Sequence, residues 1–335
     1  MPFVRSFFSI VAVIYFALLS LSCSTTKGTD YVNVGNEYAR DGLLREAGDS
    51  YQKALQQKSN NSTARRNLGI VQVKLSDYKN AVRNLEKSMN VYEDNYDANF
   101  YLAEAYRGLD QYAEAIFRYQ RANKLKANDP RTLKSLAWSF FKIRYYSQAL
   151  ATTKQLLKAH PNDGQAAIIM ARTQLKSGDN KGALATIQTY ENSSSKEAKP
   201  YFASVEGDAL YAMGRNKEAI TAYQSALKEQ PLLPGALLGM GRCLLQQKQE
   251  DRAIVYMERA IRIRPKLTEA IFLLAKAYEG KDPKKSLRFY AAFMKQAERD
   301  PEFISQLEDV KTKMASLQGA PTASEGQEGL SKESL

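Results

Sequence analysis

The chain has 335 residues, a length that suggests about two globular domains. Hydrophobic residues make up 44% of it and charged residues 25%, which excludes a wholly disordered chain. Its two cysteines exclude a disulfide scaffold, and its single histidine excludes a histidine-based metal site. The 48 basic residues outnumber the 36 acidic ones, and this net charge of +12 favours an anionic partner such as nucleic acid, membrane or acidic protein.

Residues 1–22 predict a signal peptide. Arg5 precedes an almost wholly apolar run over residues 7–21, and Cys23 follows closely. A run of about 15 residues suits a signal peptide and is short for a membrane span, which needs about 20. The segment could be removed by ordinary signal cleavage, be retained as an anchor helix, or carry a lipid.

The segment resembles a bacterial lipoprotein signal, in which a small residue precedes a lipidated cysteine, although Ser20 stands where leucine is usual. The resemblance implies that Cys23 carries acyl chains and that residues 23–30 form a tether. The protein would then face the periplasm from an envelope membrane, and nucleic acid would not be its partner. Ser24 lacks the aspartate that favours inner-membrane retention in some bacteria, so we expect the outer membrane.

A 34-residue period organises the rest of the chain. Small residues recur at this spacing, with one step of 36, at Gly35, Gly69, Ala103, Ala137, Ala171, Gly207, Gly241 and Ala275. Twelve residues after each of the first seven lies an alanine, at Ala47, Ala81, Ala115, Ala149, Ala183, Ala219 and Ala253. Four residues beyond that alanine the side chain is usually large, as at Tyr51, Leu85, Tyr119, Tyr223 and Met257.

This pattern resembles the tetratricopeptide repeat, a helix–turn–helix unit of 34 residues. The resemblance implies an all-α, right-handed superhelical solenoid of about eight units over residues 28–301. Small residues would let the paired helices approach closely, and the large ones would fill the space opposite. Because one unit cannot bury its apolar face alone, neighbouring units must stack.

Departures from the period mark the ends and a possible flexible point. The fifth unit is two residues longer than the others, and its polar, serine-rich residues 191–199 predict a loop that could flex. An apolar stripe within residues 302–318 predicts a cap helix, which repeat arrays need at their ends. Residues 319–335 are small and polar, so we expect them to be disordered.

In the resembled family, the first helices of successive units line a concave groove. The slots facing it hold Arg66, Phe100, Arg131, Lys134, Trp138, Phe141, Arg172, Tyr211 and Arg242. These slots are not expected to make contacts inside the repeats, and aromatic residues beside arginine are typical of binding hot spots. We therefore predict that they bind a protein or peptide. Alternatively, superhelix closure or a neighbouring chain covers them, and their charges are simply solvated.

Signals of catalysis and of cofactor binding are missing from the sequence. It holds no P-loop, dinucleotide-binding glycines, Gly-x-Ser-x-Gly or Cys-x-x-Cys motif. Cys243 is predicted to be a buried structural thiol, and His160 has no second ligand nearby. We expect no catalytic residue, no metal and no cofactor.

These observations predict a non-enzymatic, lipid-anchored scaffold that binds protein partners at a bacterial envelope. The layout is similar to repeat lipoproteins that help assemble pili, secretins or outer-membrane β-barrels, which is an analogy of architecture only. Two alternatives stay open. One is a periplasmic accessory subunit of a solute transporter, and the other is an adaptor that recruits peptidoglycan-remodelling enzymes.

Overall fold

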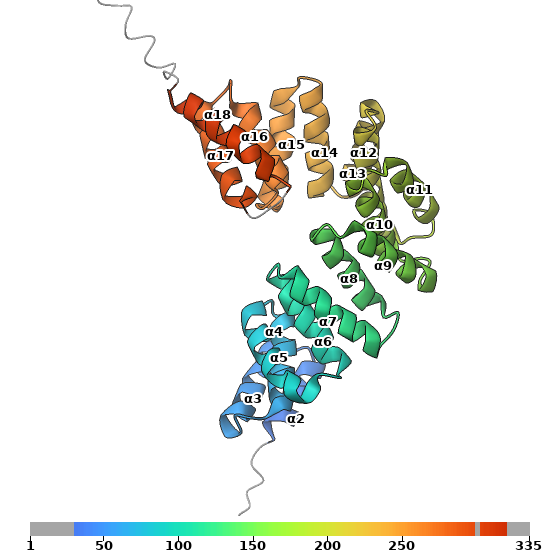
Figure 1. Cartoon of the computed structure of the whole chain (residues 1–335), viewed down its shortest axis with the longest axis vertical. Coiled ribbons are helices and arrows are strands. Elements are labelled where there is room, and N and C mark those ends of the chain that lie inside the picture. Colours follow the sequence, from blue (N-terminus) through green and yellow to red (C-terminus); the bar gives the residue numbers. More distant parts are fainter. Residues whose placement is uncertain (1–29, 299–301, 320–335) are drawn as a thin grey trace, which may run out of the picture. The chain divides into compact units, whose positions relative to one another are not determined.

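The computed structural model describes residues 30–298 and 302–319. Within these residues it contains 17 α-helices, two short 3₁₀ helices and no strand (Figure 1). The all-α prediction is therefore confirmed. Cys23, the predicted signal and tether up to residue 29, and residues 320–335 of the predicted tail lie outside the described residues.

The helices belong to two compact units, which divide between Ile143 and Arg144. The first unit holds α2 (Tyr31–Arg40), α3 (Leu44–Gln57), α4 (Ser62–Lys74), α5 (Tyr78–Tyr92), α6 (Tyr96–Gly108), α7 (Tyr112–Leu125) and α8 (Pro130–Lys142). The second begins with α9 (Tyr146–Ala159), α10 (Gly164–Lys176), α11 (Asn180–Tyr190), η1 (Lys196–Ala198), α12 (Lys199–Ala212) and α13 (Asn216–Glu229). It continues with α14 (Pro234–Gln246), α15 (Glu250–Ile263), α16 (Thr268–Tyr278), α17 (Pro283–Ala297), η2 (Ile304–Gln306) and α18 (Leu307–Gly319).

A polar side chain caps the first helix of each of the first five repeats. It accepts a hydrogen bond from a backbone N–H two or three residues further on, and such a cap stabilises a helix by about 1 kcal/mol. The capping residues are Asp30, Asn61, Asn95, Asp129 and Asp163.

The turn inside each of the first seven repeats places one residue at positive φ. These residues keep the repeat spacing and are Gly42, Ser76, Asp110, Arg144, Gly178, Gly214 and Lys248. In the turns that lie within one unit, the next residue donates its N–H to the carbonyl five positions back, as Asp77 does to Gln72 at 2.8 Å. This bond closes the Schellman arrangement that ends many helices, and the 34-residue period therefore reaches the backbone conformation as well.

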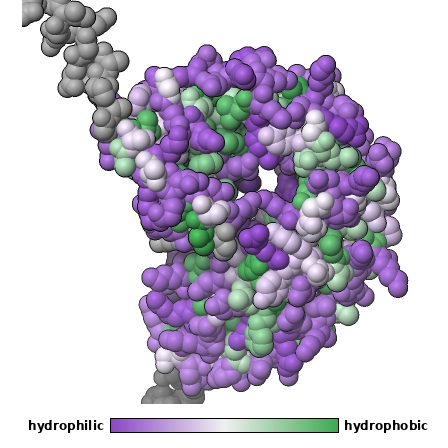
Figure 2. Space-filling view, turned by 45° about the horizontal axis from the view of Figure 1, so that its top comes forward, coloured by the Kyte–Doolittle hydropathy of each residue, from purple (hydrophilic) through white to green (hydrophobic). Residues whose placement is uncertain are grey.

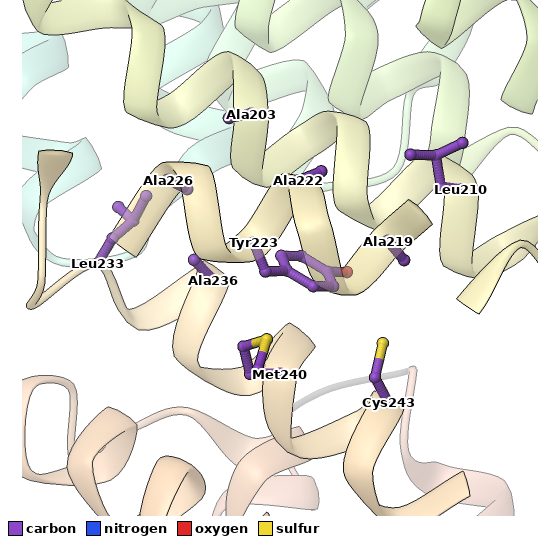
Figure 3. Close-up of a cluster of buried hydrophobic side chains, with 10 residues drawn as sticks. All are labelled: Ala203, Leu210, Ala219, Ala222, Tyr223, Ala226, Leu233, Ala236, Met240 and Cys243. Atoms are coloured by element: carbon purple, nitrogen blue, oxygen red, sulfur yellow. The ribbon is translucent and has the colours of Figure 1, made fainter. Parts of the chain in front are cut away.

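Small residues bring the two helices of a repeat together, as predicted. A Cβ atom added to Gly207 of α12 would lie 2.5 Å from the Tyr223 ring of α13, and one added to Gly241 would lie 2.5 Å from Met257. Figure 3 shows Tyr223 in one apolar cluster with residues of α14. Cys243 belongs to that cluster and is fully buried, which confirms its prediction as a structural thiol.

The end of the array and the elongated fifth repeat both lie in the second unit. The predicted cap stripe, which includes Phe303, Val310 and Leu317, packs in one cluster with Tyr290 and Phe293 of α17. Residues 191–199 follow α11 and include η1. The boundary between the two compact units does not coincide with this segment. It lies inside the fourth repeat, between α8 and α9. Flexibility at 191–199 stays a prediction.

Candidate functional site

The first unit ends with α8, which carries four of the predicted groove residues. Arg131, Lys134, Trp138 and Phe141 are spaced by three, four and three positions, so they share one face of this helix. We call these residues the α8 strip. Arg131 is exposed, and Lys134, Trp138 and Phe141 are half-buried. The indole of Trp138 stacks on the ring of Phe141, with centroids 5.2 Å apart and planes inclined by 26°.

The beginning of α8 is fixed by a buried carboxylate. Asp129 accepts hydrogen bonds from the N–H groups of Arg131 and Thr132, both at 3.1 Å, and Lys126 lies 3.1 Å from it. Burial alone would raise the pKa of Asp129. Hydrogen bonds from Tyr96, Thr132 and Lys126, with the charge of Arg131, outweigh burial and hold this pKa at about 2. The carboxylate is therefore ionised and keeps two cations at the start of the α8 strip.

Aromatic rings of α6 support the same two cations. The Arg131 guanidinium lies 5.0 Å from the ring centroid of Phe100, and the Lys126 ammonium lies 5.3 Å from that of Tyr96. Cations in such positions are attracted to the ring faces. Tyr96, Lys126 and Asp129 belong to this surface and were not predicted from the sequence. The signal that could have found Asp129 is the 34-residue spacing of the helix caps.

The structure corrects the prediction for Phe100. Its side chain is only 6% exposed because Tyr96, Tyr101 and Tyr119 surround it and Arg131 lies over it. The expectation that groove slots make no internal contacts is wrong here. Phe100 holds Arg131 in place and offers little surface of its own to a partner.

Arg66, the remaining predicted site residue of the first unit, lies on α4 and is half-buried. Its guanidinium lies 4.3 Å from the ring centroid of Tyr92 and donates to the Asn67 side chain at 2.9 Å. These contacts hold Arg66 along the helix surface and leave part of it open to solvent.

In the second unit, Arg242 of α14 is tied to other helices of the repeat array. Its guanidinium pairs with Asp208 of α12 and, at 3.4 Å, with Glu269 of α16, and it lies 4.9 Å from the ring centroid of Tyr211. Despite burial, the charge of Asp208 and then that of Glu269 raise the pKa of Arg242. Arg242 therefore links three repeats. The prediction that Arg242 binds a partner is corrected, because its charge is already paired within the array.

Arg172 of α10 differs from Arg242. It is half-buried, and no hydrogen bond or ion pair within the described residues involves its guanidinium. Burial lowers the pKa of Arg172, and the charge of Asp208 opposes this while that of Arg264 adds to it. An arginine stays protonated in proteins, so Arg172 carries a charge that no carboxylate of the described residues pairs with.

Apolar exposure alone does not mark a binding site on the described helices. The large exposed apolar side chains lie singly on different elements, as with Val91 of α5, Phe117 of α7 and Leu232 after α13. Hydrophilic residues cover most of the face seen in Figure 2. Scattered residues of this kind are normal on soluble surfaces. The α8 strip is distinguished by stacked aromatics beside cations, a combination enriched in interface cores.

Within residues 30–298 and 302–319, no group of three or more histidine, cysteine, aspartate or glutamate side chains could hold a metal ion. None of the helices in these ranges combines the length and the apolar character that crossing a membrane requires. Burial raises the pKa of the Cys243 thiol, which opposes the thiolate form that reactive cysteines use.

Known proteins share the repeat. Two sequence models described as tetratricopeptide repeat match residues 72–138 and 205–268. Protein CTR9 homolog from Arabidopsis thaliana is 31% identical over 124 residues, which make up 36% of this chain and 11% of that protein. The chain thus corresponds to a small part of that relative.

Solved structures share the fold. A tetratricopeptide repeat protein from Parabacteroides merdae has a TM-score of 0.65 at 16% identity, over 75% of this chain and 99% of that one. A chain of the APC/C hetero-tetramer Cut9–Hcn1 has a TM-score of 0.56 at 12% identity, over 80% of this chain and 52% of that one. At these identities the likeness shows the fold alone.

The repeat models, the repeated helix pairs and the solved neighbours agree on one family. Proteins of this family bind protein partners and are generally scaffolds without catalytic activity. The chain is a tetratricopeptide repeat protein, and its repeats indicate a protein-interaction scaffold.

Proposed function

We propose that the first unit binds a partner protein on the α8 strip. The observation that carries this proposal is the partly exposed stacked pair of Trp138 and Phe141 on the same helix face as Arg131 and Lys134. Aromatic and arginine side chains are the residue types that most often dominate binding energy. The strip suits a segment that offers an apolar anchor for the rings and carboxylates for the cations.

Three further residues are proposed to make weaker partner contacts. Arg66 belongs to the first unit, while Arg172 and Tyr211 belong to the second. Arg172 suits a carboxylate because its guanidinium has no ion pair in the described part of the chain. Tyr211 is half-buried beneath Arg242 and has less surface to offer.

Site-specific cross-linking tests the position of the interface. A photoreactive residue replaces Trp138 in one variant and Phe117, an exposed apolar residue of α7, in a control variant. We expect position 138, and not position 117, to give a covalent adduct with one reproducible partner segment in cells. Adducts that form equally from both positions would contradict an interface on α8.

We further propose that the scaffold is a lipoprotein that works at a bacterial envelope, facing the periplasm, in the assembly of a pilus, secretin or outer-membrane protein complex. Arg5, the apolar run over residues 7–21 and Cys23 support this proposal, and all lie outside the described residues. More than one acyl chain on Cys23 would give stable anchoring, since each buried methylene contributes about 0.8 kcal/mol.

Cell fractionation tests the anchor. We expect Cys23→Ala to move the protein from the membrane fraction to the soluble fraction, with Cys243→Ala as the matched control that stays in the membrane. Membrane association that survives Cys23→Ala would rule out the lipid anchor and leave the proposed interface on α8 untouched.

A further inference from the structure

The second unit carries a carboxylate at a position that is apolar in the other repeats. The residue just before the small slot is Val34, Leu68, Leu102, Leu136, Met170, Glu206, Met240 or Leu274 in successive repeats. Leu102 and Leu274 are fully buried there, and Met240 is 2% exposed. The slot thus normally packs an aliphatic side chain between helices. Glu206 places a charge in it, which costs free energy unless a partner compensates.

Glu206 has no such partner within the unit. It is half-buried, and no hydrogen bond or ion pair of the described residues involves its carboxylate. Arg215, the cation that lowers its pKa, is already bound to both carboxylate oxygens of Glu218, through Nε at 2.8 Å and through Nη2. Burial, followed by the charge of Glu191, raises the pKa of Glu206.

A cavity lies in front of this carboxylate. It has a volume of about 380 Å³ and is bounded by α11, α12 and α13, with Glu206 and Leu210 contributed by α12. Leu184 of α11 and Ala222 of α13 form apolar walls, and Thr221 supplies a hydroxyl group. The volume falls at the lower end of the range for small-molecule sites, about 300–1,000 Å³.

The charged residues that line the cavity indicate which kind of ligand it can bind. Glu206 and Glu218 outnumber Arg215, so the cavity favours a cation. A hard metal ion needs several oxygen ligands, and Glu206 is the one carboxylate of the lining without an ion pair in the described residues. The apolar walls call for carbon atoms behind the charge.

We propose that this cavity binds a protonated primary alkylamine, with its ammonium group paired to Glu206 and its carbon chain against Leu184, Leu210 and Ala222. The amine belongs either to a free small molecule or to a lysine side chain of a protein. This site lies on the second unit and is independent of the α8 strip.

Titration of the full chain with two amine probes tests the proposal. The probes are n-pentylamine, for a free alkylamine, and Nα-acetyl-lysine amide, for a lysine side chain; n-pentanol and Nα,Nε-diacetyl-lysine amide are the uncharged controls. We expect at least one amine to bind saturably, with a dissociation constant of about 1 mM, which is attainable for a ligand with so few atoms. The uncharged controls should not bind.

Matched variants assign the binding to the cavity. Glu206→Gln keeps the shape and removes the charge, so we expect at least tenfold weaker amine binding. Glu218→Gln removes a carboxylate that already has a partner, so we expect less than a threefold change. Circular dichroism checks that both variants are folded.

The pattern of binding decides the outcome. Preference for n-pentylamine would identify a small-molecule site, and preference for the lysine amide would identify a protein partner. Failure of both amines to bind, or equal binding by the original protein and Glu206→Gln, would overturn the proposal.

Discussion

The α6–α8 region of the first unit and the α12–α14 region of the second build on the same contact. In each, a buried tyrosine donates its hydroxyl to a carboxylate located one position after the small slot. The pairs are Tyr119 with Glu104 and Tyr223 with Asp208. Their partners then differ. Glu104 pairs with Arg107 of its own helix and also accepts a hydrogen bond from Ser135 of the next repeat, while Asp208 pairs with a cation of the next repeat, Arg242.

The difference decides what the next repeat presents to a partner. Trp138 follows Glu104 by 34 residues, as Arg242 follows Asp208, so the two occupy equivalent positions. Arg242 is drawn into a link between repeats. Trp138 makes no such link and stays partly exposed, stacked on Phe141. Equivalent slots thus link repeats in one region and stay partly exposed in the other.

The largest expected effect comes from breaking the link of the second unit. Asp208→Ala leaves Arg242, whose side chain is only 20% exposed, without its nearest counter-charge. We expect a loss of about 2–4 kcal/mol in the free energy of unfolding, somewhat below the value for a fully buried pair. Glu104→Ala should cost less, about 1–2 kcal/mol, because the Arg107 side chain is 35% exposed and can turn to water. Equal losses in chemical denaturation would remove the contrast between the regions.

A smaller effect should come from the small slot. Gly207→Ala puts a methyl group against the Tyr223 ring, and we expect overpacking to cost about 1–3 kcal/mol. Gly48 of α3 is the matched control, because an added Cβ there would meet its nearest neighbour at 3.8 Å. Gly48→Ala should stabilise the first unit by about 0.5–1 kcal/mol through helix propensity. Denaturation midpoints that move in the same direction for both variants would contradict the close contact at Gly207.

The smallest stability effect concerns Glu206 and depends on pH. Its pKa is raised in the folded protein, so the folded state keeps the proton at pH values where the unfolded state has lost it. Wild-type stability should therefore fall as the pH rises from about 4.3, and Glu206→Gln should be the more stable protein at pH 7, with little difference between the two at pH 4. Thermal denaturation at both pH values checks this. A wild-type protein that is more stable than Glu206→Gln at pH 7 would contradict a raised pKa of Glu206.

Much of the fold could be predicted because the same contact between a small and a large residue recurs in successive repeats. The small residues at Gly207 and Gly241 and the large ones at Tyr223 and Met257 appear in the sequence at fixed spacing, and the structure pairs them as expected. The division between Ile143 and Arg144 has no comparable signal, because the fourth repeat keeps the common length and the common turn.

The candidate site was harder to predict because the role of a slot depends on its neighbours. The burial of Phe100 follows from Tyr96, which lies outside the predicted groove slots. Arg242 was predicted to bind a partner, whereas in the structure it pairs with Asp208, 34 residues earlier in the chain. Glu206 stands out only when all repeats are aligned and the cavity in front of it is known.

The affinity of the cross-linked partner segment for the α8 strip is the most direct test of the scaffold function. Calorimetric titration would compare the original protein with Trp138→Ala/Lys134→Glu and with the control variant Phe117→Ala. We predict about 100-fold weaker binding for the double variant, which corresponds to roughly 3 kcal/mol, with the helices intact by circular dichroism and the control unchanged. Binding by the double variant within twofold of the original protein would contradict an interface on α8.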